Sequence, residues 1–381
     1  MKEYIRRWLI VAELCSMNSR GGTLVVVNGA HVSGLAERGA WVLRASGQGR
    51  VVCREAGRVS AIKAFLAGAR DLRPCTVYAI DCAVATVILG LIARSLWRSR
   101  VVIDSGDATA ALVRSTGTGG YAGFVGAKIL ERVGYTMSET IVVRSRGLAE
   151  HVKATSGRDT VIIPDGFDPV KISPRNGEEF RKEWGADDDA LIVGVLGSAR
   201  WNARLQWCYG RDVVEAVGLT RRRDVVGVII ASGNGLPYLR RLAQRRGVGD
   251  RIRFVEPGTG ESLLRQLGAV DVALSTQTND VVGQCRTTGK LVLYLATGKY
   301  ILASRVGTAA ELLPPEMLID YEGGWDEGYF RRLAERLDAL PARTELAKRG
   351  RALLPLSSQF AYPSLLKIWK EKVFSDWRDS T

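Results

Sequence analysis

The sequence VGVLGSARWNAR, residues 193–204, is the stretch that decides the fold. A hydrophobic strand over residues 191–196 runs into Gly197 and Ser198, and Arg200 and Arg204 follow closely. A buried strand that ends in a glycine turn is typical of a doubly wound α/β domain, which binds its ligand at that strand end. Helix N-termini at such an end carry unpaired N–H groups and partial positive charge, so the pattern favours a bound phosphate.

A second stretch of the same character is RTTGKLVLYLATGKYILASRVGTAAELL, residues 286–313. Here Thr287, Thr288 and Gly289 lead into an apolar helix that carries Lys290 on its first turn. Guanidinium and ammonium groups can neutralise a diphosphate without a metal ion. Together the two stretches predict a diphosphate site built from Gly197, Ser198, Arg200, Arg204, Thr287, Thr288 and Lys290.

The composition is that of a globular protein with two domains. The chain has 381 residues, of which 46% are hydrophobic and 25% charged, which is enough chain for two ordinary cores. A net charge of +14 attracts anionic partners such as nucleic acid, anionic lipid head groups or phosphorylated substrates. An arginine-rich composition without a functional role is an equally good explanation of that charge.

Cysteines and histidines indicate a reduced protein without a metal centre. Six cysteines lie far apart with no CxxC pair, as in cytoplasmic proteins, and two histidines do not supply a zinc site. The longest apolar run, residues 83–93, is too short to span a bilayer. The basic and apolar start at residues 2–15 is interrupted by Glu13, which argues against a secretion signal and leaves Met17 as an alternative start.

Alternating apolar strands and helices predict two tandem α/β units. In the first unit we expect strands at 24–29, 50–53, 76–81, 101–107, 140–145 and 161–166, and helices at 61–69, 84–97 and 147–155. We also expect a glycine-rich connection over residues 116–126, which leads into a helix that ends at 132. In the second we expect strands at 191–196, 225–230, 252–256, 270–275 and 300–304, and helices at 205–217, 236–246, 261–268 and 290–296. Residues 167–177, with two prolines, are the expected linker.

Several motifs in the second half resemble retaining glycosyltransferases of the GT-B fold in family four, which includes sucrose synthases and mannosyltransferases. They are IPDGFDP (163–169), GNGLPYLRRLAQRRGVGDRIRFVEP (233–257), DVALS (271–275), KLVLYLATGKYILAS (290–304) and VGTAAELL (306–313). Their order and spacing are those of the family. The resemblance implies an α/β GT-B fold, with two Rossmann-like doubly wound domains facing across a cleft. It predicts an acceptor domain (1–166), a linker (167–177), a donor domain (178–358) and a C-terminal segment (359–381) whose helix packs back on the first domain.

The resemblance also assigns roles to residues. The seven diphosphate-site residues keep that role, and backbone groups at Val255 and Glu256 read the nucleobase. Arg200, Lys290 and Asp107 are the implied catalytic residues. The implied contacts to the sugar or the acceptor are His31, Asp104, Asp107 and Asp280.

This chain departs from the family pattern at three places. Leu293 and Cys285 stand where the family carries a pair of glutamates, and Gly106 precedes Asp107 where the family has histidine. A leucine cannot accept the ribose hydroxyls that the second glutamate accepts. A protein carboxylate nucleophile is not required for retention by same-face attack, so these losses weaken donor positioning without forbidding catalysis.

The implied reaction moves a sugar from a nucleoside-diphosphate sugar to an acceptor hydroxyl, with retention and with no metal or other cofactor. Two alternatives stay open: a catalytically inactive GT-B-like binding subunit, and a nucleotide-sugar epimerase of the GT-B fold. The basic charge suits an anionic acceptor, such as a lipid, a modified DNA base or a phosphorylated small molecule. We expect a cytoplasmic protein without a transmembrane segment, with peripheral contact to the inner membrane face through residues 84–100.

Overall fold

The computed structural model describes residues 21–31, 33–54, 57–204 and 206–375. The expectations about residues 2–15 and about a start at Met17 lie outside these residues. The chain divides into two compact units. Unit 1 comprises the described residues within Met1–Arg114, Thr118–Asp165 and Tyr362–Thr381, and unit 2 comprises Ser115–Gly117 and those within Gly166–Ala361.

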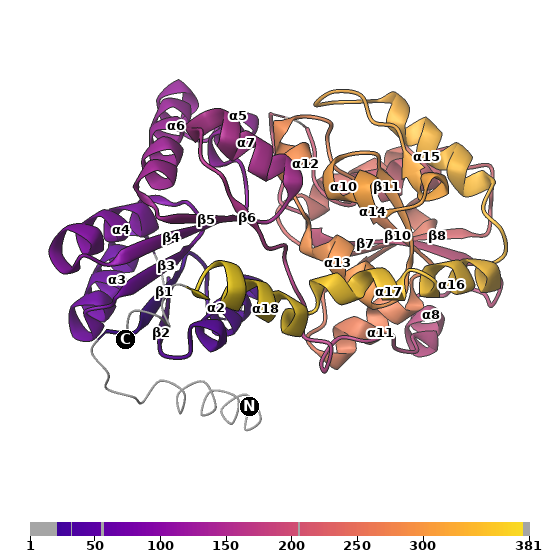
Figure 1. Ribbon diagram of the computed structural model, residues 1–381. Helices are drawn as coiled ribbons and strands as arrows, with labels where there is room; N and C mark the ends of the chain where they lie inside the picture. The colour runs from indigo at the N-terminus through magenta and orange to yellow at the C-terminus, as the bar shows by residue number, and fades with distance from the viewer. Residues whose placement is uncertain (1–20, 32, 55–56, 205, 376–381) are drawn as a thin grey trace. The chain divides into compact units, whose positions relative to one another are not determined.

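Unit 1 is built on a parallel six-stranded sheet with the order β2-β1-β3-β4-β5-β6 (Figure 1). Its strands are β1 (Thr23–Val27), β2 (Gly49–Cys53), β3 (Thr76–Ile80), β4 (Arg100–Ser105), β5 (Thr140–Val143) and β6 (Val161–Ile162). Its helices are α2 (Gly34–Ser46), α3 (Arg58–Leu72), α4 (Val84–Trp97), α5 (Thr109–Thr116), α6 (Gly120–Met137), α7 (Arg146–Ser156) and α18 (Tyr362–Lys372).

The strands of unit 1 read as unbroken apolar runs because both faces of the sheet are covered. Val25 and Val27 pack on the face that carries α2 and α18, and the alternate residues Leu24 and Val26 are equally buried on the other face. The C-terminal helix α18 belongs to this unit, and its Trp369 is fully buried in the unit 1 core beside α2.

Unit 2 is a second parallel six-stranded sheet, with the order β12-β11-β10-β7-β8-β9. Its strands are β7 (Leu191–Ser198), β8 (Val225–Ser232), β9 (Ile252–Val255), β10 (Val272–Ser275), β11 (Tyr300–Ser304) and β12 (Leu318–Ile319). Its helices are α8 (Glu178–Glu183), α9 (Arg211–Leu219), α10 (Leu236–Arg245), α11 (Glu261–Ala269), α12 (Val281–Cys285), α13 (Gly289–Ala296), α14 (Gly307–Leu312), α15 (Gly328–Asp338), α16 (Arg343–Arg351) and α17 (Leu354–Ser357).

Each sheet has one point at which the strand order reverses. In unit 1 it lies between β1 and β3, and in unit 2 between β7 and β10. Connections from neighbouring strands leave in opposite directions at such a point, which opens a crevice outside the carboxyl ends of the strands, where ligands of doubly wound folds bind. The strand order therefore marks one candidate site in each unit.

Two expected elements are wrong. The glycine-rich connection over 116–126 is largely helical, since α6 begins at Gly120. The helix expected from residue 205 begins only at Arg211, and the described residues before it form a loop closed by an Asn202–Trp207 bridge. Residues 167–177, expected as a linker, are grouped with unit 2, where Phe167 pairs with Ala361.

Candidate active site

The site in unit 2 is centred on the side chain of Lys290, at the start of α13. Its Nζ lies 3.4 Å from the centre of the Tyr209 ring. That ring packs on Gly197 at the end of β7, so closely that a Cβ at this position would lie 3.2 Å from the ring. Glycine thus permits the stack of strand end, ring and ammonium group. The geometry brings two of the predicted diphosphate residues, Gly197 and Lys290, to the reversal point of the sheet.

The ammonium group of Lys290 is buried and has no hydrogen-bond acceptor among the described residues. Burial lowers the pKa of Lys290, and the nearby Tyr209 and Asp212 offset only part of this effect. A buried, desolvated cation gains more from an incoming anion than a solvated one does, because water screens it less.

Tyr209 and Arg286 complete the cationic environment. The Tyr209 hydroxyl accepts a hydrogen bond of 3.1 Å from Gln277 Nε2, just beyond β10. Burial raises the pKa of Tyr209, but the positive charges of Lys290 and Arg286 outweigh that effect and hold it below its ordinary value. The site therefore has a positive local field, provided by α13 and the residue after α12.

The two predicted arginines, Arg200 and Arg204, lie in the loop between β7 and α9. Arg200 follows the end of β7, and Arg204 lies in the turn before residue 205; both are exposed. The Lys290 side chain is turned inward against Tyr209, while both arginines are exposed, and their joint contact with a diphosphate stays a prediction. Ser198, at the last position of β7, is also exposed.

The remaining diphosphate residues flank the start of α13. Thr288 is its N-cap, with extended backbone and no side-chain capping hydrogen bond within the described chain. Thr287 is buried, and its hydroxyl lies 2.7 Å from that of Thr308. The first turn of α13 thus directs backbone N–H groups toward the strand end beside Lys290, as a helix N-terminus does for an anion.

The expected nucleobase and sugar contacts of unit 2 are further from this centre. Val255 ends β9, two strands from β7, which corresponds to about 10 Å across the sheet. The carbonyl of Glu256 accepts a hydrogen bond from Gln266. Asp280 is the N-cap of α12, and its Oδ1 accepts hydrogen bonds of 3.0 Å from the Gly283 N–H and the Thr278 hydroxyl. Its place in the structure is that of a turn residue.

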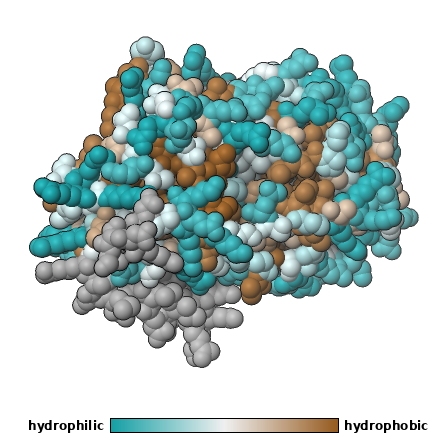
Figure 2. All heavy atoms as spheres, in the orientation of Figure 1, coloured by the Kyte–Doolittle hydropathy of each residue, from teal (hydrophilic) through white to brown (hydrophobic). Residues whose placement is uncertain are grey.

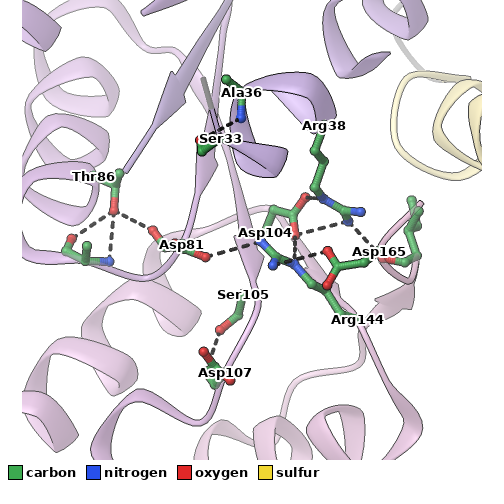
Figure 3. A network of polar contacts seen from close by, with 12 residues as sticks. Ser33, Ala36, Arg38, Asp81, Thr86, Asp104, Ser105, Asp107, Arg144 and Asp165 are labelled. Atoms are coloured by element: carbon green, nitrogen blue, oxygen red, sulfur yellow. Dashed lines mark hydrogen bonds and ion pairs between the residues drawn. The ribbon is translucent and has the colours of Figure 1, made fainter. Parts of the chain in front are cut away.

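Unit 1 contains a cavity of about 580 Å³ at the carboxyl ends of its strands. Asn28 after β1, Arg54 after β2, Asp81 after β3 and Asp107 after β4 line its polar end. Asn28 and Asp81 flank the reversal point between β1 and β3. Of the residues predicted for unit 1, Asp107 therefore lies in the cavity, and its backbone carbonyl accepts a hydrogen bond from the Ser105 hydroxyl (Figure 3).

Asp104 is the prediction that the structure contradicts most directly. Its side chain is fully buried in β4, where it accepts hydrogen bonds of 2.7 Å from Arg38 and 2.8 Å from Tyr78. A group enclosed in this way is not available to a sugar or an acceptor. It neutralises Arg38, which reaches it from α2 and is itself 1% exposed.

Arg144 links this buried pair to the cavity. Asp81, Asp104 and Asp165 all point toward its guanidinium group, at 3.2, 3.7 and 3.2 Å (Figure 3). Burial lowers the pKa of Arg144, but the surrounding carboxylates outweigh this effect and raise it above its ordinary value. Arg144 is therefore a permanent cation beneath the cavity, and it fixes the position of Asp81.

Asp81 has two unusual properties. Its backbone is in the left-handed region, with φ of 72°, which is uncommon for a non-glycine residue, although aspartate adopts it more readily than most. Burial, with smaller contributions from Asp107, Asp104 and Asp165, raises its pKa to about 6, against the opposing effect of Arg144. An uncommon backbone conformation and a perturbed acid in a crevice are both characteristic of functional sites.

The two histidines lie outside the polar end of the cavity. His31 is exposed in the turn after β1. His151 lies on α7, as expected for a structural residue, with Nε2 at 3.8 Å from Glu131 Oε2 of α6. Among the residues that the structure describes, no group of three or more His, Cys, Asp or Glu side chains is arranged to hold a metal ion.

Comparison with known proteins supports the fold independently. No protein-family model matches the chain. Among solved structures, the Thermosynechococcus elongatus sucrose-phosphate synthase superposes with a TM-score of 0.72 at 15% identity, covering 95% of this chain and 100% of that one. Anabaena Alr3699/HepE, solved in complex with UDP and glucose, superposes with a TM-score of 0.71 at 15% identity, covering 93% of this chain and all of its own. The chain has the GT-B glycosyltransferase fold.

Sequence relatives are consistent with family 4, which this GT-B chain resembles. The D-inositol 3-phosphate glycosyltransferase of Geodermatophilus obscurus is 27% identical over 216 residues, which is 54% of this chain and 45% of the relative. The enzyme of the same name from Corynebacterium efficiens is 31% identical over 172 residues, or 42% of this chain and 38% of the relative. The matches thus span less than half the length of these relatives.

Sequence reasoning missed four residues of the two sites in this GT-B chain. Tyr209 lies in a loop of unit 2, and only the fold brings it to Lys290, whereas Arg286 precedes Lys290 by four residues and was overlooked there. Asp81 was visible at the end of an apolar strand, but its left-handed backbone was not. Arg144 directly follows β5, and its burial, which gives it its role, cannot be read from the sequence.

Proposed function

We propose that this protein transfers a sugar from a nucleoside-diphosphate sugar to an acceptor hydroxyl, with retention and without a metal ion. The observation that carries the proposal is the buried Lys290 ammonium group, which has no acceptor in the described chain and lies at the N-terminus of α13 beside Tyr209. The names of the relatives and the UDP bound in structural neighbours support the same donor class.

In this proposal the residues around Lys290 act on the leaving group. As the glycosidic bond to the diphosphate breaks, negative charge grows on the β-phosphate oxygens. Lys290, Arg286 and the N–H groups of the first turn of α13 would stabilise that charge in a preorganised arrangement. Arg200 and Arg204, both exposed, would add charge-assisted hydrogen bonds to the diphosphate, and the Lys290 ammonium group would turn outward from the Tyr209 ring to meet it. The leaving phosphate would take the proton of the acceptor hydroxyl, so that no protein carboxylate acts as nucleophile.

Calorimetric titration of the full-length protein with UDP, GDP, ADP and dTDP tests the donor site. One of these nucleotides should bind, and Lys290→Met should weaken it about ten- to hundredfold, because a charged hydrogen-bond donor is lost while the side-chain volume is kept. Arg349→Ala is the matched control: it removes one positive charge from α16, which packs on the amino-terminal end of β11.

The outcomes of this titration are distinct. Binding that Arg349→Ala leaves intact and Lys290→Met weakens supports the proposed donor site. No binding of any nucleotide, or equal binding by Lys290→Met, would contradict it. Binding of a nucleotide in the titration, with no product when the protein is incubated with nucleotide sugars and an acceptor, would favour the inactive binding subunit over the enzyme.

Peripheral contact with the cytoplasmic face of a membrane is the second part of the proposal. None of the described helices has the length and hydropathy to cross a membrane. On α4, Leu91 is 41% and Leu96 69% exposed, next to the exposed Arg98. Hydrophilic side chains cover most of the face seen in Figure 2, with hydrophobic areas between them. Exposed leucines beside arginines suit an anionic bilayer surface, and flotation with anionic liposomes should retain the wild type more strongly than a Leu91→Ser, Leu96→Ser variant.

A further inference from the structure

The cavity in unit 1 has a polar end and an apolar body, and these two parts are built from different elements. The polar end consists of the strand-end residues Asn28, Arg54, Asp81 and Asp107. The body is formed by small and aliphatic side chains of the β3–α4 turn, α4, α5 and α6, namely Cys82, Val84, Leu112, Val113, Ala127 and Leu130. A volume of about 580 Å³ lies within the range of sites for small organic ligands, about 300–1,000 Å³.

The polar end presents more negative than positive charge. Of its charged side chains, Asp81 and Asp107 are carboxylates and Arg54 is a cation. Arg54 is already held at 3.1 Å by the side-chain oxygen of Asn28. Arg144, below the cavity floor, is shared among Asp81, Asp104 and Asp165. Carboxylates accept hydrogen bonds from hydroxyl groups and repel a phosphate.

The backbone around the cavity keeps space open at a cost in stability. Asp81 holds its carboxylate there through the left-handed backbone, and Arg144 fixes its orientation. On the other side, Gly119, the N-cap of α6, and Gly123 and Gly126 of α6 lie along the cavity wall. A Cβ at Gly126 would meet no atom within 4 Å, so packing does not require a glycine at this helical position, where it costs about 0.5–1 kcal/mol relative to alanine.

We propose that this cavity binds an uncharged acceptor that carries hydroxyl groups on an apolar body, with the hydroxyl groups held by Asp81 and Asp107. This inference rests on the proposed function, since it names the acceptor class of the same reaction. It differs from the acceptor in the names of the sequence relatives, an inositol 3-phosphate, whose phosphate the two carboxylates would repel. Asp81 is a positioning residue that accepts a hydrogen bond from the acceptor.

The test uses the full-length protein and calorimetric titration with four probes. 4-Nitrophenyl β-glucoside is an uncharged hydroxyl compound with an apolar ring, methyl β-glucoside lacks the ring, and 4-nitrophenyl phosphate replaces the hydroxyl groups by a phosphate. Vesicles of phosphatidylcholine that contain a monoglucosyl diacylglycerol present the same chemistry in a bilayer. We expect the nitrophenyl glucoside to bind at least tenfold more tightly than methyl glucoside and than nitrophenyl phosphate.

Three variants connect the binding to the cavity. Gly126→Leu fills the cavity from α6 and should abolish binding of the nitrophenyl glucoside. Gly34→Leu is the matched control, because Gly34 is also exposed, also has no atom within 4 Å of a built Cβ, and does not line the cavity. Asp81→Asn keeps the shape but removes a charge-assisted hydrogen bond, and should weaken binding about tenfold.

Each outcome decides the proposal. Binding of the soluble glucoside that Gly126→Leu abolishes supports it with a soluble acceptor, and vesicle retention that Gly126→Leu abolishes supports it with a lipid acceptor. Tighter binding of nitrophenyl phosphate, or no binding of any probe while a nucleotide still binds, would overturn the acceptor class and leave the proposed function standing. A protein that binds no nucleotide would instead overturn the proposed function itself.

Discussion

Replacing Asp81 by asparagine is expected to stabilise unit 1 at neutral pH. The carboxyl pKa of Asp81 is raised from 3.8 to about 6, chiefly by burial. A raised carboxyl pKa means that the native state holds the proton more tightly than the unfolded chain does. Ionisation therefore withdraws stability as the pH rises from about 4 through about 6, and the full loss is present at pH 7.5.

The size of this effect follows from the same values. About two pH units of difference, at about 1.36 kcal/mol each, give an upper bound of about 3 kcal/mol. The side chain is 30% exposed, so solvent screening reduces the expected gain to about 1–2 kcal/mol. Asparagine tolerates the left-handed backbone and can still accept the hydrogen bond of 3.2 Å from Arg144.

The assay is urea unfolding at pH 4.5 and pH 7.5, read by hydrogen exchange of peptides from β3 and β4. These peptides report on unit 1 alone, which matters because a chain of two units need not unfold in one step. Asp81→Asn should exceed the wild type in free energy of unfolding at pH 7.5 and approach it at pH 4.5. Asp159→Asn, an exposed carboxylate paired with Lys153, should show no such gain. The reasoning would be refuted if Asp81→Asn were less stable than the wild type at pH 7.5. It would also be refuted if the free energy of unfolding of the variant differed from that of the wild type by the same amount at both pH values.

Three further predictions concern the buried network and the donor site. Asp104→Ala leaves Arg38 and Arg144 buried without this partner, so unit 1 should lose about 3–5 kcal/mol, measured by the same exchange experiment; a loss below about 1 kcal/mol would contradict the network. Trp369→Ala removes a fully buried side chain and its hydrogen bond of 3.0 Å to the Tyr78 hydroxyl, and should lower the free energy of unfolding of unit 1 by about 3–5 kcal/mol. Unchanged hydrogen exchange in β3 and α2 would show that α18 contributes little to this stability. Nucleotide affinity should fall with rising pH already below the ordinary lysine pKa of 10.5, because burial lowers the pKa of Lys290, which faces Tyr209, Asp212 and Arg286, and the neutral amine binds phosphate poorly. Calorimetry on Lys290→Met should show a flatter pH dependence, and an equal slope would assign the titration to another group.

The local sequence pattern was enough to predict those strands and helices that depend on residues adjacent along the chain. Residues 191–196 were predicted as a strand because an unbroken apolar run is what a doubly covered sheet requires, and β7 spans Leu191–Ser198. The predicted helix 290–296 lies within α13 (Gly289–Ala296) for a similar reason. The prediction of a connection over residues 120–126 was wrong, because tertiary packing of α6 overrides the weak helix propensity of glycine.

Features that depend on distant residues could not be read from the sequence. Asp104 resembled a polar strand end, but the arginine that neutralises it is 66 residues away in α2. Tyr209 and Lys290 meet only because β7 and β10 are neighbours in the sheet. The importance of Asp81 rests on a backbone angle and on burial, neither of which leaves a mark in the order of residues.

Sugar transfer itself is the most direct test of the Lys290 site. Full-length wild type, Lys290→Met and Arg349→Ala would be incubated with UDP-, GDP-, ADP- and dTDP-sugars and with 4-nitrophenyl glucoside as acceptor, and the glycosylated product measured by mass spectrometry. The account predicts product from one donor, with kcat/KM unchanged in Arg349→Ala and reduced at least about a hundredfold in Lys290→Met. Product formation by Lys290→Met at the wild-type rate would contradict it.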